Sequence, residues 1–130
     1  PLSSALGKDE LIRLSRLHGF HVFDLNSVKN ELQVRLAFFH AERAFNEKSN
    51  ISNHLSLEIM ARLAATRQIT DAVAKVGIKD PSNILAAYRA GTPGMNEIRL
   101  KKITKAKRIA WKQKNADEEI RRMVEAEIEE

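Results

Sequence analysis

The sequence lacks several residues and patterns on which common protein chemistries depend. It has no cysteine, which excludes disulfide bonds, zinc sites with thiolate ligands, iron–sulfur clusters and cysteine nucleophiles. Its five glycines are scattered, so there is no glycine-rich loop of the kind that cradles phosphates. There is also no apolar run near the ~20 residues of a membrane-spanning helix, and no signal-peptide pattern. We therefore expect a protein of the reducing cytoplasm with no membrane partner.

What the sequence does contain is the composition of a compact domain. It has 130 residues, of which 43% are hydrophobic and 30% are charged, close to ordinary globular proteins. A chain of this length buries roughly two-thirds of its unfolded surface when it folds. No repeat and no low-complexity linker interrupts it. We therefore predict a single domain over residues 1–130.

Charge is distributed unevenly along the chain, whose net charge is +5. Residues 99–114 include eight basic residues and no acidic one, whereas residues 115–130 include seven acidic residues and two arginines. The two segments could lie antiparallel and neutralise each other. Alternatively, the basic segment could be a surface that contacts phosphates. The sequence leaves both interpretations open.

The clearest apolar periodicity lies in residues 28–47. Asn26 and Ser27 are good N-cap residues. Behind them an apolar stripe is formed by Val28, Leu32, Leu36 and Phe39, and its flank is widened by Val34, Phe38, Ala41 and Phe45. We predict a long helix here. An apolar face this broad indicates that the helix packs under a sheet or between two neighbours.

Other segments give further expectations. Residues 20–25 alternate imperfectly, as in a strand, and residues 55–65 and 69–76 have helical periodicity, with Gly77 placed as a C-terminal cap. Residues 104–114 are expected to form a basic helix. A final helix is expected after residue 115.

Two segments are ambiguous from the residues alone. Residues 8–17 suit either a short helix or an edge strand. Residues 84–90 form a short apolar run between turn residues, which suits a central strand. Asp80, Pro81 and Gly91 would equally suit the ends of a helix.

The sequence offers little catalytic chemistry. His18 and His21 are three apart, which on a strand would point them to opposite faces, so we predict no metal site. Glu58 lies beside the apolar face of its helix, where an ion pair or a cap explains it better than a catalytic base does. We therefore expect a binding protein, with no catalytic residues, no cofactor and no small-molecule substrate.

One string in the chain is distinctive. Residues 57–80 read LEIMARLAATRQITDAVAKVGIKD, and they resemble the core motif of the small regulatory subunit of the KEOPS complex, the PRPK-binding protein or TPRKB family. The positions that match the family pattern are Glu58, Ile59, Arg62, Gln68, Ile69, Ala72, Val73, Gly77, Lys79 and Asp80. Ala65 departs from it, because the family often has glycine there. The resemblance is clear over residues 18–90 and rests on helix order elsewhere.

The resemblance implies an α/β (α+β) fold, with a small, mostly antiparallel sheet packed with several helices and residues 84–90 as a strand. It also implies a role in tRNA processing, as a non-catalytic subunit of the complex that makes threonylcarbamoyladenosine. Such a subunit binds the atypical protein kinase (ATPase) subunit and helps dock the acceptor end of the tRNA.

Two sets of residues are compatible with these roles. Cations and a polar side chain near the turn between the two motif helices suit a single-stranded RNA end. They are Arg62, Arg67, Gln68, Lys75 and Lys79. Apolar residues of the final helix suit kinase binding or, equally, the protein's own core. They are Ile120, Met123, Val124 and Ile128. The alternative function is a stand-alone basic RNA-binding domain with no kinase partner.

Overall fold

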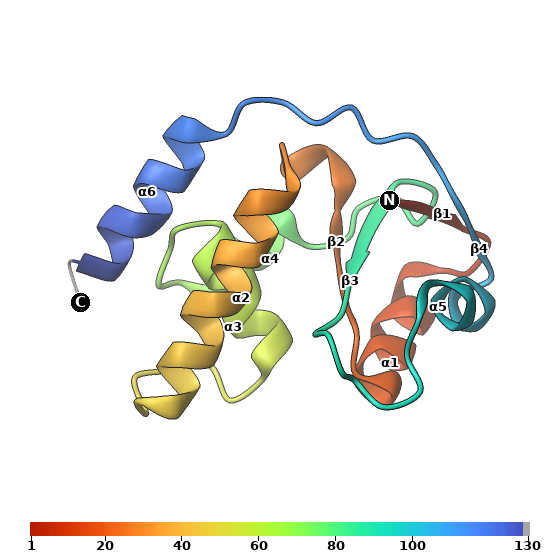
Figure 1. Cartoon of the computed structure of the whole chain (residues 1–130), viewed down its shortest axis with the longest axis horizontal. Helices are drawn as coiled ribbons and strands as arrows, with labels where there is room; N and C mark the ends of the chain where they lie inside the picture. Colours follow the sequence, from red (N-terminus) through yellow and green to blue (C-terminus); the bar gives the residue numbers. More distant parts are fainter. Residues whose placement is uncertain (129–130) are drawn as a thin grey trace. The chain divides into compact units, whose positions relative to one another are not determined.

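The computed structural model describes residues 1–128 (Figure 1). Within these residues the chain forms six α-helices and one four-stranded antiparallel sheet with the strand order β2-β3-β1-β4. The expected α+β class is therefore confirmed. The chain divides into two compact units, which we call the sheet unit (residues 1–26 and 78–112) and the helical unit (residues 27–77 and 113–128). That residues 1–130 form one domain stays a prediction.

The sheet unit contains all four strands. They are β1 (Leu2–Ser4), β2 (His21–Asp24), β3 (Ile84–Ala87) and β4 (Ala106–Arg108). Leu2 pairs with Ile84 on one side and with Arg108 on the other, so β1 lies inside the sheet. β3 confirms the strand that the family resemblance implied, and β2 confirms the strand expected near residue 20.

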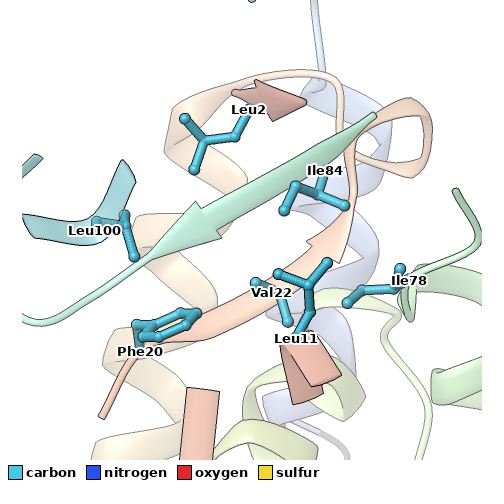
Figure 2. Packing of buried hydrophobic residues seen from close by; sticks show 7 residues of the cluster. All are labelled: Leu2, Leu11, Phe20, Val22, Ile78, Ile84 and Leu100. Atoms are coloured by element: carbon cyan, nitrogen blue, oxygen red, sulfur yellow. The ribbon is translucent and has the colours of Figure 1, made fainter. Parts of the chain in front are cut away.

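Two helices accompany this sheet, α1 (Lys8–His18) and α5 (Glu97–Thr104). Buried side chains meet in one apolar cluster, shown in Figure 2, against which Ala106 of β4 also packs. Its members are Leu2, Leu11, Phe20, Val22, Ile78, Ile84 and Leu100. Gly19 ends α1 with a φ of 77°, a conformation that favours glycine. The ambiguity over residues 8–17 is therefore resolved as a helix.

The predicted basic helix over residues 104–114 is wrong. The helix in this region begins earlier, because the Asn96 side chain accepts a hydrogen bond from the Arg99 backbone N–H and caps it. Lys105 then takes a left-handed conformation with a φ of 47°, which ends the helix. The next three residues pair with β1 as an edge strand, so sheet pairing overrides local helix propensity.

The helical unit consists of α2 (Glu31–Asn46), α3 (Leu55–Leu63), α4 (Ile69–Val76) and α6 (Asp117–Ile128). All four were expected. α2 begins at Glu31 and not at residue 28 as predicted, because Asn30 and Gln33 form a capping box that marks its start. Residues 25–27, before it, form a 3-10 turn. α4 ends at Gly77. A Cβ atom added to this residue would lie 2.5 Å from the Val73 carbonyl oxygen, which is too close, so glycine suits this position.

The broad helix α2 packs between two neighbours, α3 and α6, as its sequence indicated. The face that it buries matches the predicted one only in part. Val34 and Ala41 of the predicted flank are buried together with Ala37, and Leu36 is half-buried, whereas Leu32 and Phe39 are exposed. Small side chains at the centre of the buried face let the helices approach closely, and two large residues of the predicted stripe are left at the surface.

Candidate functional site

A buried carboxylate organises the helical unit. Glu58 of α3 is completely buried, and its Oε1 accepts hydrogen bonds from the backbone N–H groups of Ile51 and Ser52 at 2.7 and 2.8 Å. Its Oε2 accepts a hydrogen bond of 2.9 Å from Arg62 Nε, one turn along the same helix. The expectation that Glu58 serves as a cap and an ion-pair partner is confirmed. Both of its oxygens are engaged, which explains how a charged group is tolerated in the interior.

A second carboxylate ties α6 to the same place. Glu127 lies in the last turn of α6, and its Oε1 is 2.7 Å from Arg62 Nη1 and 3.4 Å from His40 Nδ1. Its Oε2 is 3.2 Å from Arg43 Nη2. Arg62 therefore bridges two nearly buried carboxylates, one from its own helix and one from α6. We call Glu58, Arg62, Glu127, His40 and Arg43 the ionic clasp.

The ionic clasp fixes which side of α6 is available to a partner. Met123 is buried, with 1% of its surface exposed, and Ile120 is half-buried. Val124 and Ile128 are exposed by 40% and 78%. The four residues predicted to bind a kinase therefore divide: Met123 is a core residue, Ile120 is intermediate, and Val124 and Ile128 are available at the surface.

The turn that follows α3 closes in a regular way. Ala65 has a φ of 54°, and the backbone N–H groups of Ala65 and Thr66 donate to the carbonyls of Arg62 and Ala61, which is the Schellman pattern. An alanine thus occupies the left-handed position that glycine suits best. With alanine at this position the chain still forms a regular Schellman turn, at a cost in backbone strain.

The residues predicted to bind tRNA lie in different surroundings. Arg67 and Gln68 are exposed just before α4, and Lys75 is exposed in the last turn of that helix, which is about 12 Å long. Arg62 is buried in the ionic clasp, so we leave it out of the proposed RNA surface. Lys79 is exposed and belongs to the sheet unit, where its Nζ lies 3.4 Å from Asp24 Oδ2.

The oppositely charged segments have local partners. In the sheet unit, Glu97 lies 3.1 Å from Arg108 and 3.8 Å from Lys101. In the helical unit, four of the five acidic residues of α6 pair with cations of the same unit. These pairs are Glu119 with Lys29, Glu118 with Arg121 and Arg122, Glu125 with Arg121, and Glu127 with the cations of the ionic clasp. Glu129 and Glu130 of the acidic segment lie outside the described residues.

Burial sets the protonation of one histidine. His21 on β2 is buried, and desolvation lowers its pKa to about 4. It is therefore neutral at physiological pH. Among residues 1–128, no group of three or more histidine, aspartate or glutamate side chains lies in an arrangement that could hold a metal ion.

Sequence reasoning missed most of the ionic clasp. The spacing of Glu58 and Arg62 by four residues on a helix was a visible signal for an ion pair. Nothing in the sequence indicated that Glu127, which is 65 positions from Arg62, forms an ion pair with it. The exposure of Leu32 and Phe39 was also missed, because their spacing is that of a core stripe.

No helix in residues 1–128 is long and apolar enough to cross a membrane. A comparison with curated protein sequences gives no significant match. A family model described as kinase binding protein CGI-121, the TPRKB family, matches residues 8–127, which include the whole ionic clasp and parts of both units but not β1. The match confirms the resemblance found in the sequence. The chain belongs to the CGI-121 family of kinase-binding proteins.

Proposed function

We propose that this protein is the non-catalytic regulatory subunit of a cytoplasmic KEOPS complex, binding its atypical kinase and helping to recruit the 3′ end of tRNA. The observation that carries the proposal is the family match over residues 8–127, because that family binds a kinase. The exposed apolar residues of α6 support it, since they offer a helix face of the kind that docks on a partner. The subunit itself turns over no ATP, which an ATPase assay on the isolated chain checks.

Kinase binding is tested by mixing the purified chain with the atypical kinase and measuring the complex by calorimetry. Val124→Glu places a charge on the exposed face of α6 and weakens the complex, while the melting temperature of the free subunit changes little. The control is Glu125→Gln, an exposed change one position away that removes a charge instead of adding one. Failure of the unsubstituted chain to bind, together with tight RNA binding, would favour the stand-alone RNA-binding domain.

The proposed tRNA role rests on exposed residues of each unit taken separately, which are Arg67, Gln68 and Lys75 in the helical unit and Lys79 in the sheet unit. If cationic side chains bind the single-stranded end of the tRNA, the affinity of the protein for tRNA falls as the salt concentration rises. The slope of log K against log salt is then about −0.7 per phosphate contact. Arg67→Glu combined with Lys79→Glu flattens that slope and lowers affinity. Removing the unpaired 3′ nucleotides of the tRNA has a similar effect.

A competing surface is the basic segment of the sheet unit. Lys105, Lys107 and Arg108 are all exposed there. Charge reversal of these three residues serves as the matched comparison for the Arg67 and Lys79 variant. If it abolishes RNA binding while the other variant binds normally, the RNA site lies on the basic segment.

A further inference from the structure

The helical unit exposes large apolar side chains on two adjacent helices. Seven large hydrophobic residues are exposed in the described part of the chain, and four of them belong to α2 and α6. Leu32 and Phe39 of α2 are exposed by 58% and 60%. On α6, the exposed pair is Val124 and Ile128. Exposure of large apolar residues close together marks interaction sites, whereas single exposed ones are ordinary.

The two helices run side by side in the same direction. At their beginnings, Lys29 Nζ lies 2.6 Å from Glu119, and the Lys114 backbone N–H donates to the Lys29 carbonyl. At their ends, Glu127 meets Arg43 and His40. Contacts at both ends of α6 fix the register, so Glu127 in its last turn is level with His40 and Arg43 of α2, and α2 continues beyond that point (Figure 1).

The exposed residues border the seam between these helices. Phe39 precedes His40, and the Arg43 guanidinium lies 5.7 Å from the centroid of the Phe39 ring, so Phe39 lies beside the ionic clasp. Val124 is three positions before Glu127 and Ile128 directly follows it, so both lie beside the clasp from the other helix. Leu32 is two turns before Phe39, on the same side of α2. At 3.6 residues per turn, Leu32 and Phe39 lie on the side of α2 opposite buried Ala37, and Val124 and Ile128 lie on the side of α6 turned away from buried Met123.

The composition of this surface fits a protein partner. A phenylalanine and three aliphatic side chains form the apolar part, and exposed charged residues such as Arg35 and Arg121 border it. An apolar centre with an aromatic anchor and a polar rim is the usual anatomy of a protein–protein interface. The family model spans both helices up to Glu127, and its description names one kind of partner, a kinase.

We infer that the kinase docks on α2 and α6 together, with Leu32 and Phe39 contributing as much to the interface as Val124 and Ile128, and that the ionic clasp assembles this two-helix surface. The inference rests on the proposed function for its partner and adds α2, which nothing in the family description assigns. Glu127 acts here as a positioning residue, because it holds α6 against α2 without contacting the kinase.

The test compares variants of exposed apolar residues in the full chain. Phe39→Ser and Leu32→Ser each weaken kinase binding about tenfold or more, measured by calorimetry. Ile98→Ser is the matched control, because Ile98 is 78% exposed on α5 of the sheet unit, and it leaves affinity within about twofold. Leu32 is the second α2 variant because it lies far from Arg43 and its loss does not disturb the ionic clasp. Circular dichroism and melting curves confirm that the three variants fold alike.

The outcomes separate this inference from the function on which it rests. If the unsubstituted chain does not bind the kinase, the proposed function fails. If it binds, and both α2 variants bind as tightly as the Ile98 variant, the two-helix surface is wrong while the function stands. If the chain instead forms dimers that Phe39→Ser dissociates, as measured by analytical ultracentrifugation, the occupant is a second copy and the inference is overturned.

Discussion

Replacing Arg62 with leucine tests whether this residue has a structural role. Arg62 has about 5% of its surface exposed, and it lies 2.8 Å from Glu58 and 2.7 Å from Glu127. Arg62→Leu fills similar space but removes the cation shared by both carboxylates. Glu58 and Glu127 then face each other across the interior with Arg43 and His40 as the remaining neighbours of Glu127.

The expected loss of stability follows from burial. Removing one partner of a buried ion pair costs about 3–5 kcal/mol, because the other charge stays in the interior uncompensated. That is a large part of the roughly 5–15 kcal/mol that stabilises a typical domain. With a denaturant dependence of about 2 kcal/mol per molar urea, the unfolding midpoint falls by about 2 M.

Urea unfolding followed by circular dichroism measures this midpoint. Arg67→Leu is the control, because Arg67 is exposed and its replacement changes stability by less than about 0.5 kcal/mol. Adding Glu58→Gln to Arg62→Leu recovers part of the loss, since glutamine removes the unpaired charge and still accepts the hydrogen bonds from Ile51 and Ser52. A midpoint for Arg62→Leu within 0.5 M of the parent would refute the structural role, and Arg62 would return to the candidate RNA-binding residues.

Two further predictions concern backbone strain and pH. Ala65→Gly relieves the left-handed conformation and stabilises the protein by about 1 kcal/mol, whereas the same substitution at exposed Ala74, within α4, destabilises it by about 1 kcal/mol. Melting curves that move in the same direction for both variants would contradict this. Because the folded pKa of His21 lies below its unfolded value of 6.5, the unfolded chain binds the proton first, and stability falls by about 2 kcal/mol from pH 7 to pH 5. His21→Gln should flatten that dependence, and an unchanged slope would show that other groups cause it.

Local signals predicted most of the elements, because capping and periodicity act within a few residues. α3 and α4 appear where the apolar spacing placed them, and Gly77 ends α4. The Glu58 cap and ion pair were also predictable, since both partners lie on or next to the same helix. The resemblance to the family, rather than any local pattern, decided that residues 84–87 form a strand.

Contacts between residues distant in sequence decide the features that the sequence did not predict. The segment 106–108 becomes a strand because β1 pairs with it, and nothing nearby in sequence announces that partner. Leu32 and Phe39 share the spacing of a core stripe, yet α2 buries its alanines instead. Periodicity identifies a helix with an apolar side, but only the neighbouring helices decide which side is buried. The candidate site depends on such contacts, because Glu127 joins Arg62 from the far end of the sequence.

The position of β1 inside the sheet has a consequence for how the protein folds. Leu2 pairs with residues 84 and 108, so β1 has no partner on either side until two segments far along the chain come together with it. Contacts between residues this distant in sequence slow folding, since a long loop must close before they form. The helical unit likewise joins residues 27–77 to α6 across the intervening segment 78–112, which belongs to the sheet unit. Neither unit is therefore complete in residues 1–77 alone, where β1 lacks both of its strand partners and Arg62 lacks the Glu127 carboxylate.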